Sequence, residues 1–411
     1  MLLLSHPTGS QFVREALRAF DERGWLKEFC TPLSWRKDSL ASKILPAKVR
    51  RQCERRSYSE RLWSRTRTRP FREGGRMLAS SVGWGWPIRH EVGPWSIDAV
   101  CRSLDSWVAR RLKTVPDLTA VYAYEDAAEA TFAAAKRLGL RTIYEHPVGY
   151  WRDVQRLFHE ELELNPEYAG AIAGIEDSGA KRERKDREIA QADLIVVPSS
   201  YSARTLQECP TLRAKIEVVN YGAPTVTLES PPESDSEKLR VMFVGSLQQR
   251  KGISYVVDAC NSLQKQIEVT VIGSRVGECK PLDAWLSSIN WIPSAPHSEV
   301  LENMRRNDVL VLPSLSEGFG LVVLEAMSQG MTVLVSENTG AGDVAEDGVE
   351  GFVVPIRSSE AIAEKLEILI REPERRQSMR EAALKKARTR QWDVYREELA
   401  NAVGPMVGSK S

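Results

Sequence analysis

The chain has 411 residues, of which 42% are hydrophobic and 27% charged, and its net charge is +1, values typical of an ordinary globular protein. No apolar run reaches the ~18 residues that a membrane span requires, and the opening MLLLSHP is too short for a signal peptide. The six cysteines form no C-x-x-C pair and have no metal-ligand spacing. The composition therefore predicts a cytoplasmic protein with reduced thiols, and the length predicts two domains.

The charge is unevenly distributed along the chain. Residues 36–76 contain fourteen Lys or Arg against four acidic residues, a net +10, so the remainder carries −9. Trp63 and Phe71 interrupt the densest part, RLWSRTRTRPFREGGR. An anionic membrane surface, nucleic acid, or a solvated basic loop would each explain such a segment. We expect no nucleic-acid partner, because the second half of the chain contains no nucleic-acid-binding module.

The first half of the chain predicts alternating strands and helices. Strands are expected in MLLLSHP, LKEFCTPL, DLTAVYAYE, RTIYEHP and ADLIVVPS, and helices in SQFVREALRAFDERG, SIDAVCRSLDSWVARRL and DAAEATFAAAKRLG. Apolar strands that alternate with helices indicate a parallel sheet covered on both faces. The basic segment 36–76 interrupts this alternation.

A segment with linker composition, PTVTLESPPESDSEK, separates this half from a second alternating series. Strands are expected there in LRVMFVGS, IEVTVIGS, INWIP, DVLVLPS, MTVLVSE and GFVVP. We therefore predict an α/β fold with two Rossmann-like, doubly wound domains that face each other across a cleft. The predicted boundaries are 1–225 for the first domain, 226–238 for the linker and 239–385 for the second domain.

The segment FVGSLQQRKGI is predicted to run from a strand end through a loop into a helix. Gly245 permits a tight exit from the strand, and Gly252 lets the backbone come close at the helix entry. Arg250 and Lys251 lie between them, beside a helix N-terminus that favours anions. This arrangement predicts a phosphate site, although an ordinary surface Arg-Lys pair would have the same sequence. It matches neither the P-loop nor the dinucleotide fingerprint.

The segment PSLSEGFGLVVLEAM contains two glutamates, Glu317 and Glu325, with seven residues between them. Glu317 follows a strand, and Glu325 is six residues into a helix expected to begin near Phe319, about 9 Å along its axis. A diphosphate spanning this distance would place a sugar near Glu317 and a ribose near Glu325, whose carboxylate would accept hydroxyl hydrogen bonds. The N–H groups facing the ligand would be those of Phe319, Gly320 and Leu321. Either glutamate alone could be an ordinary helix residue, but the pair beside Arg-Lys-Gly indicates a binding site.

At these residues the chain resembles retaining glycosyltransferases of the GT-B fold, from the large family 4. That family commonly has a Gly-loop with K-G, then P-S-x-x-E-G-F-G-L-x-x-x-E-A-M, then a Gly-containing strand–turn segment. This chain has GSLQQRKG, PSLSEGFGLVVLEAM and TGAGDVAEDGVEGFVVP in that order. The resemblance covers 239–385 and extends less closely to 184–206 and to VVNYGAP. The end of the chain, 386–411, resembles the helix that crosses back to the first domain in this fold, with Trp392 and Tyr395 as packing residues.

The resemblance implies transfer of a sugar from a nucleotide diphosphate with retention of the anomeric configuration. Arg250 and Lys251 would stabilise the diphosphate of the leaving group, Glu317 would orient the sugar hydroxyls, and Glu325 would bind the ribose. The donor site would also be lined by Gly245, Ser246, Gly273, Ile292, Phe319, Gly320 and Leu321.

The first domain would contribute His146, in YEHP, to the donor sugar, although it could instead be a strand-end histidine bonded to backbone. His6 and Gly9 occupy the position of the family's first Gly-loop and would lie on the acceptor side. The chain departs from the family at three places. Only Gly9 remains of that loop, Ser246 replaces a basic residue, and Ala223-Pro224 replace an Asp after YG.

We expect no cofactor and no metal site, because the sequence has no D-x-D pair and its five histidines are scattered. The donor would be a UDP- or GDP-sugar, and the acceptor a lipid-linked or cell-surface glycan intermediate, with segment 36–76 holding the enzyme at the inner face of the membrane. A soluble small-molecule acceptor is the main alternative. A non-catalytic GT-B scaffold, a nucleic-acid binder, and an epimerase or phosphorylase on the same fold are the others.

Overall fold

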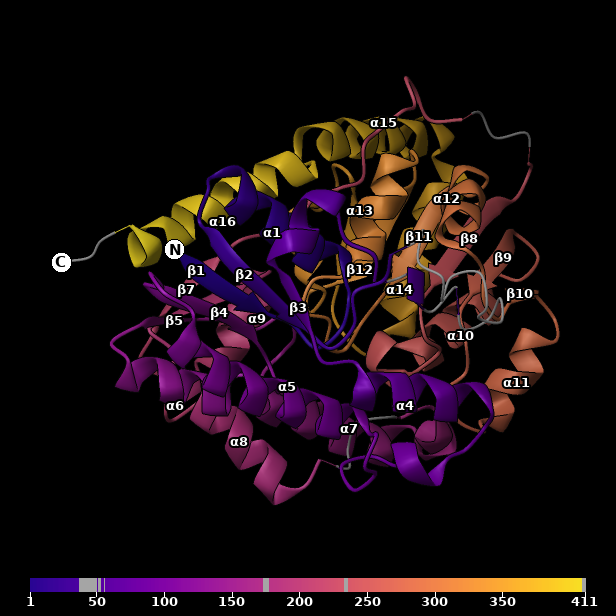
Figure 1. The fold of residues 1–411 in the computed structure, drawn as a ribbon. Coiled ribbons are helices and arrows are strands. Elements are labelled where there is room, and N and C mark those ends of the chain that lie inside the picture. The colour runs from indigo at the N-terminus through magenta and orange to yellow at the C-terminus, as the bar shows by residue number, and fades with distance from the viewer. Residues whose placement is uncertain (37–49, 51–52, 55, 173–176, 233–235, 409–411) are drawn as a thin grey trace.

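The computed structural model describes residues 1–36, 50, 53–54, 56–172, 177–232 and 236–408. They form two parallel β-sheets, one on the left and one on the right of Figure 1, each flanked by helices. The first sheet is built from residues before 219 and the second from residues after 238. Parts of the basic segment (37–49, 51–52 and 55), of the linker (233–235) and of the C-terminal segment (409–411) lie outside the described residues.

The first sheet has the strand order β3-β2-β1-β4-β5-β6-β7, with all pairs parallel. Its strands are β1 (Leu2–Ser5), β2 (Leu26–Thr31), β3 (Thr66–Thr68), β4 (Ala120–Tyr124), β5 (Arg141–Glu145), β6 (Leu194–Val197) and β7 (Lys215–Val218). The five predicted strands are confirmed, and β3 and β7 were missed. These two are the edge strands, TRT and KIEV, whose side chains are largely outside the core and so lack an apolar run.

Helices on both faces cover the first sheet. They are α1 (Gln11–Glu22), α4 (Phe71–Ser81), α5 (Ile97–Arg111), α6 (Glu129–Arg137), α7 (Trp151–Leu164), α8 (Gly179–Ala190) and α9 (Ser200–Leu206), with 3₁₀ turns η1 (Glu60–Arg65), η2 (Trp86–Ile88), η3 (Leu112–Thr114) and η4 (Pro166–Ala171). Serine N-caps mark the first residues of several of these helices. The side chain of Ser96 accepts a hydrogen bond from the N–H of Ala99, and Ser199 caps α9 in the same way.

The second sheet has the order β10-β9-β8-β11-β12-β13 and is also parallel throughout. Its strands are β8 (Leu239–Val244), β9 (Ile267–Ile272), β10 (Asn290–Ile292), β11 (Val309–Leu312), β12 (Thr332–Ser336) and β13 (Gly351–Val354). Its helices are α10 (Ile253–Ser262), α11 (Lys280–Leu286), α12 (His297–Arg305), α13 (Leu321–Ser328), α14 (Ser359–Arg371) and α15 (Pro373–Thr389), with η5 (Gln249–Lys251) and η6 (Gly340–Asp343). All six predicted strands are confirmed. Strands β11 and β12 are buried along their whole length, as expected of a parallel sheet covered on both sides.

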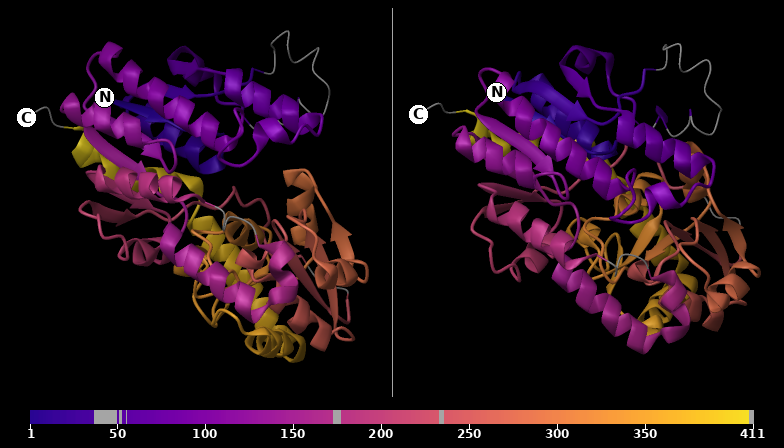
Figure 2. Two further views of the ribbon diagram at one scale, coloured as in Figure 1. Left: turned by 90° about the horizontal axis from the view of Figure 1, so that it is seen from below. Right: turned by 60° about the horizontal axis from the view of Figure 1, so that its bottom comes forward.

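The last helix, α16 (Trp392–Val407), leaves the second half and packs against α1 (Figure 1). Arg396 forms an ion pair of 2.6 Å with Glu15 of α1, and the ring of buried Tyr395 lies 5.5 Å from that of Tyr221. Both views in Figure 2 place the start of β1 and the end of α16 at the same end of the molecule. The two halves are thus linked by the C-terminal helix as well as by the chain connection.

A buried carboxylate on α7 makes a second link between the halves. Glu161 accepts hydrogen bonds from the guanidinium of Arg357 and the side-chain amide of Gln249, both at 2.6 Å, and from the hydroxyl of Tyr255. All three donors belong to the second half. Arg357 has a left-handed backbone, with φ 65°, which a non-glycine residue adopts only where its surroundings enforce it.

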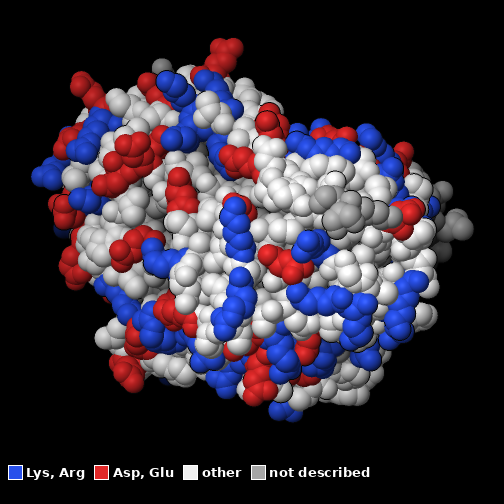
Figure 3. Space-filling view, turned by 90° about the vertical axis from the view of Figure 1, so that its left-hand side faces the viewer, with Lys and Arg blue, Asp and Glu red and all other residues white. Residues whose placement is uncertain are grey.

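The described part of the basic segment does not interrupt the fold, contrary to the sequence prediction. It contains β3, the edge strand, and α4, so the alternation of strands and helices continues through it. Many of its arginines are paired: Arg56 and Arg76 with buried Glu73, and Arg61 and Arg65 with Asp21. On the face shown in Figure 3, basic and acidic side chains are interspersed. Each described helix is too short or not apolar enough to cross a membrane.

Candidate active site

Loops at the carboxyl ends of both sheets line an open cavity of about 560 Å³. We call it the Glu325 cavity. The first half contributes Phe12, Pro147 and Tyr221. The second half contributes Val244, Gly245, Lys251, Ala295, His297, Val300, Glu317, Phe319, Gly320, Leu321, Val322 and Glu325. Parallel α/β sheets bind ligands at this edge, and the cavity brings together both glutamates and the lysine that the sequence singled out.

Two cations converge on the carboxylate of Glu317. The Nζ atom of Lys251 lies 2.8 Å from its Oε2 atom, and the guanidinium of Arg250 lies 3.2 Å from the same oxygen. Arg250 also donates a hydrogen bond of 2.6 Å to the carbonyl of Ser316. Burial alone would raise the pKa of Glu317, but the attraction of Lys251 and Arg250 outweighs it and lowers the pKa to about 2. Glu317 is therefore ionised at neutral pH.

Two glycines bring these loops together. Gly252, with φ 71°, separates η5 from α10, and a Cβ atom on it would lie 2.2 Å from the carbonyl oxygen of Pro313. Gly320 adopts φ 86° immediately before α13, and a Cβ atom there would lie 3.3 Å from Cγ of Glu317. Only glycine takes up such conformations at no steric cost. The close approach of the two loops sets the Lys251–Glu317 contact.

Glu325 is the fifth of the eight residues of α13 and faces a histidine that was not predicted from the sequence. The Nε2 atom of His297, the first residue of α12, is 3.6 Å from Oε1 of Glu325. Burial raises the pKa of Glu325, and His297 acts in the opposite direction. Nothing in the segment PHSEV identifies this contact, because it depends on how α12 packs beside α13.

The turn before α13 leaves amide groups available to a ligand. The helix begins at Leu321, two residues later than the sequence predicted, because Gly320 is left-handed. Within the described residues, the N–H groups of Phe319 and Gly320 donate to no backbone acceptor. The ring of Phe319 is buried and packs edge-on against Tyr221 at 5.2 Å. The N–H groups therefore lie in the cavity wall, beside a Phe319–Tyr221 contact between the two halves.

The remaining predicted donor-side residues surround the ends of β8, β9 and β10. Gly245 lines the cavity, and Gly273 packs so tightly against it that a Cβ atom on Gly273 would overlap the Gly245 carbonyl. The N–H of Gly273 donates to the carbonyl of Ile292 at 2.9 Å, and the hydroxyl of Ser246 accepts from Gln248 at 2.6 Å. Ser246, Gly273 and Ile292 are outside the lining of the Glu325 cavity. An open depression of about 840 Å³ adjoins them, lined by Ser274, Arg275, Val276, Gly277, Glu278, Cys279, Lys280, Asp283, Trp291 and Pro293.

A second cavity, of about 430 Å³, lies on the other side of Glu317, and we call it the Trp151 cavity. Its walls are His90, Glu125, Val148, Gly149, Trp151, Val154, Gln155, Phe158, Asp177, Lys181, Arg182, Lys185, Arg250, Ser316, Glu317 and Gly318. Among the residues that the structure describes, Glu317 alone lines both this cavity and the Glu325 cavity. The Trp151 cavity thus places aromatic, cationic and further carboxylate side chains next to Glu317. The sequence analysis missed most of these residues, which come from six separate segments.

Three predicted first-half residues do not reach the walls of either cavity. His146 is buried directly after β5, and burial lowers its pKa. Its neighbours Pro147 and Val148 form the walls instead. His6 is buried against Tyr124 at 4.5 Å, and burial lowers its pKa to about 3. Gly9 lies before α1, and Phe12 in that helix is the residue that reaches the Glu325 cavity.

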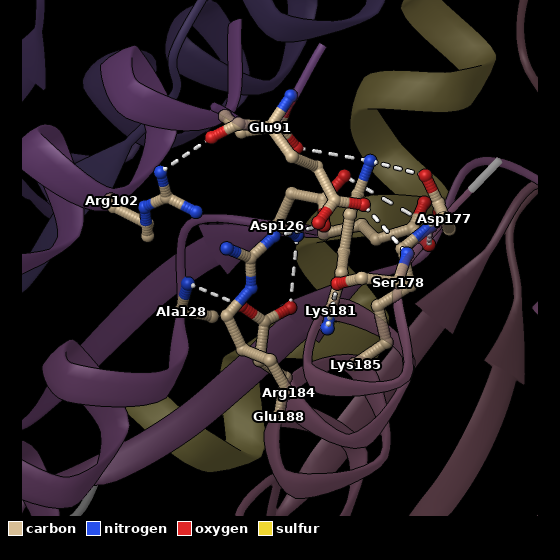
Figure 4. Close-up of polar contacts among 12 residues, drawn as sticks. Glu91, Arg102, Asp126, Ala128, Asp177, Ser178, Lys181, Arg184, Lys185 and Glu188 are labelled. Atoms are coloured by element: carbon tan, nitrogen blue, oxygen red, sulfur yellow. Dashed lines mark hydrogen bonds and ion pairs between the residues drawn. The ribbon is translucent and has the colours of Figure 1, made fainter. Parts of the chain in front are cut away.

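No cluster of metal-binding side chains was predicted from the sequence, yet the structure brings one group together. Ligand-type atoms of His90, Glu91 and Asp177 lie within 4.8 Å of one another. The ammonium of Lys181 already lies 2.7 Å from Asp177 (Figure 4). It also lies 3.0 Å from Asp98. The ammonium of Lys181 therefore already supplies a positive charge to this group, which lies at the rim of the Trp151 cavity.

Known proteins resemble parts of this chain in sequence and almost all of it in fold. Residues 225–386 match the family model described as "Glycosyl transferases group 1". D-inositol 3-phosphate glycosyltransferase of Corynebacterium aurimucosum is 26% identical over 251 residues, which cover 55% of this chain and 60% of that protein. Amylovoran biosynthesis glycosyltransferase AmsK of Erwinia amylovora is 28% identical over 141 residues, which cover 31% of this chain and 35% of that protein. The matched stretches thus span less than two thirds of these relatives.

Solved structures match over almost the whole chain. Sucrose-phosphate synthase from Thermosynechococcus elongatus has a TM-score of 0.67 at 15% identity, with 98% of both chains covered. Anabaena Alr3699/HepE in complex with UDP-glucose has a TM-score of 0.62 at 16% identity, covering 98% of this chain and 99% of that one. These likenesses confirm the predicted fold class: an α/β, two-domain GT-B fold.

Proposed function

We propose that this protein is a retaining, metal-independent glycosyltransferase of family 4, which transfers a sugar from a nucleotide diphosphate to an acceptor hydroxyl. One observation carries the proposal. Lys251 and Arg250 both contact Glu317, which lines the Glu325 cavity together with Lys251 and Glu325. The group 1 glycosyltransferase match over 225–386 includes all four residues and supports the proposal.

The donor would lie in the Glu325 cavity. The ribose hydroxyls would donate to Glu325, and the diphosphate would lie beside Lys251, Arg250 and the free N–H groups before α13. In the transfer, the bond between the anomeric carbon and the phosphate oxygen breaks, and its electron pair leaves with the nucleoside diphosphate. The acceptor hydroxyl oxygen bonds to the anomeric carbon on the same face, and its proton passes to the departing phosphate. Lys251 and Arg250 would stabilise the charge that grows there, a role that a metal ion fills elsewhere.

We infer a UDP- or GDP-sugar as the donor. A structural neighbour, Anabaena Alr3699/HepE, is described in complex with UDP, with UDP-glucose, and with UDP and glucose, which favours the uridine nucleotide. No other cofactor is proposed.

The acceptor would enter the Trp151 cavity, because Glu317 and Arg250 lie in its wall and the sugar must meet the acceptor there. We infer a lipid-linked or cell-surface glycan intermediate, handled on the cytoplasmic face of the membrane with help from segment 36–76. The name of the Erwinia relative, an amylovoran biosynthesis enzyme, favours this class. The inositol phosphate named for the Corynebacterium relative favours a small soluble acceptor instead.

The test is thermal stabilisation by UDP-, GDP-, ADP- and dTDP-sugars in three proteins: wild type, Glu325→Ala, and the control Glu364→Ala, which removes an exposed glutamate of α14. Saturation at a hundred times the dissociation constant should add ~2.7 kcal/mol. We expect one nucleotide class to stabilise wild type and the control but not Glu325→Ala. Release of nucleoside diphosphate with an acceptor extract then separates an enzyme from a scaffold, which would bind without turnover. If no nucleotide sugar stabilises wild type, the proposal is wrong.

A further inference from the structure

Large apolar side chains are exposed on one short stretch of the first half. Phe71 exposes 85% of its surface, Trp86 63% and Val92 72%. Together with Leu78, Val82 and Trp84 they form what we call the apolar patch, six residues between positions 71 and 92. The other large exposed hydrophobic residues of the described chain are spread over residues 97–349. Scattered exposed apolar residues need no explanation, but a concentration of this kind marks an interaction surface.

The patch is continuous from α4 into the loop that follows it. Leu78 follows Phe71 by seven positions and Val82 follows Leu78 by four, so the three side chains lie along one face of α4 and its C-terminal end. The opposite face buries Glu73, Met77 and Ala79. Trp84 continues the patch, with its ring edge-on to Trp86 at 6.0 Å. The outer side of α4 therefore exposes Phe71 and Leu78 beside Arg72 and Ser80, where a surface helix normally places mainly polar side chains.

Unpaired positive charge surrounds the patch. Arg69, Arg72 and Arg89 are exposed, and none of them has an ion-pair partner among the described residues. Arg72 instead donates to the carbonyl of Pro94 at 2.5 Å. Aromatic rings and arginines together suit the boundary between the headgroups and acyl chains of an anionic bilayer, where rings insert shallowly and cations meet phosphate.

The loop that carries Trp84, Trp86 and Val92 is firmly anchored. Glu91 adopts a left-handed backbone, with φ 55°, which is strained for glutamate. Its carboxylate accepts a hydrogen bond from the N–H of Ser178 at 2.7 Å, and its carbonyl accepts one from Arg102 at 3.1 Å (Figure 4). Its own N–H donates to Asp98 at 3.1 Å. These contacts hold the loop against α5 and the start of α8, so the apolar side chains project from a fixed support.

We propose that α4 and the loop 82–92 form a docking surface for an anionic lipid bilayer. A second copy of this chain fits the surface less well, because a two-fold interface would bring the arginines of one copy next to those of the other. The same loop places His90, between Trp86 and Val92, in the wall of the Trp151 cavity. If the proposed transfer function holds, an acceptor anchored in the membrane would therefore have its reacting end at this cavity.

The test is co-sedimentation of the full chain with phosphatidylcholine vesicles, with and without about 30% phosphatidylglycerol. We expect binding to the anionic vesicles and a loss of roughly tenfold or more in the double variant Phe71→Ser, Trp86→Ser. The control variant Leu164→Ser, Val349→Ser removes two exposed apolar residues outside the patch, 59% and 42% exposed, and should bind as wild type. A third variant, Arg72→Gln, Arg89→Gln, should lose the preference for phosphatidylglycerol.

The proposal is wrong if wild type does not sediment with anionic vesicles, or if the patch and control variants bind equally. It is also wrong if wild type is a dimer that does not bind vesicles and the patch variant is a monomer. Quenching of tryptophan emission by brominated lipids gives an independent readout in wild type. Stabilisation by nucleotide sugars is measured on the same variants and should be unchanged, so failure of vesicle binding and failure of the transfer function are distinguished.

Discussion

The ammonium of Lys251 lies 2.8 Å from the carboxylate of Glu317, and both groups are largely shielded from solvent. Arg250 completes a group of two cations and one anion, which leaves one positive charge uncompensated. A diphosphate in the Glu325 cavity would meet cations whose positions are already fixed by Glu317. Such preorganised charge is most effective where a leaving group becomes more negative.

Replacing Lys251 by alanine tests this arrangement. We expect kcat/KM to fall by about 10²–10³-fold, the usual effect of removing one group that stabilises developing charge. The control is Lys265→Ala, at an exposed lysine in the loop before β9, which should keep its activity. Steady-state rates with the nucleotide sugar identified by thermal stabilisation give the comparison. A Lys251→Ala enzyme with normal kcat/KM would exclude Lys251 from the transfer step.

Donor binding should depend on pH through Glu325. Burial raises the pKa of this carboxyl above its ordinary value of 4.5, and only the ionised form accepts two hydrogen bonds from the ribose. Nucleotide affinity should therefore increase as the pH rises from 4.5 through the raised pKa, and then level off. Calorimetric titration with the nucleoside diphosphate between pH 5 and 8 measures this change in affinity.

The matched control for this pH dependence is Glu325→Gln, which keeps the shape of the side chain but cannot ionise. Its affinity should be lower than that of wild type and constant over the range where wild type changes. A second variant, His297→Gln, removes the group that favours ionisation of Glu325, so the wild-type profile should shift to higher pH. The same slope in wild type and Glu325→Gln would assign the titration to another residue.

Substitution of Gly320 by alanine should disturb both stability and donor binding. The left-handed backbone would cost about 1–2 kcal/mol of unfolding free energy with a Cβ atom present, and this atom would lie 3.3 Å from Glu317. The control is Gly179→Ala, at the start of α8, where no atom lies within 4 Å of the new Cβ. That control should be neutral or slightly stabilising. Denaturant unfolding measures both, and equal midpoints would contradict the strain argument.

Glu161 and Glu160 form a natural pair of test sites on α7. Glu161 is fully buried and accepts from Arg357 and Gln249 of the second half, whereas Glu160 is partly exposed and pairs with Arg357 and Arg156. Glu161→Ala should lower the free energy of unfolding by about 3 kcal/mol or more, because it leaves buried donors without an acceptor. Glu160→Ala should cost less than about 1 kcal/mol. Similar losses for both variants would show that the buried carboxylate does not join the two halves.

Much of the fold could be predicted because local patterns encode it. Eleven of the thirteen strands are visible as short apolar runs, and the turn residues between them mark where they end. The exceptions, β3 and β7, are edge strands with polar or half-exposed side chains, for which pairing in the sheet, rather than composition, decides the structure. The basic segment was predicted to interrupt the fold for a similar reason: its many charged residues leave no apolar run that would indicate β3 or α4.

The sequence by itself determined the order of elements, the GT-B architecture, and the placement of Lys251, Glu317 and Glu325 around one cavity, because each lies within a few residues of a strand end or helix start. Only the tertiary structure decided that His297 faces Glu325, that His146 is buried while Pro147 and Val148 form the cavity walls, and that His90 meets Asp177. These contacts join residues 28 to 87 positions apart or depend on burial. They arise from the packing of helices on the sheets, and no local pattern of residues specifies which side chains that packing brings together.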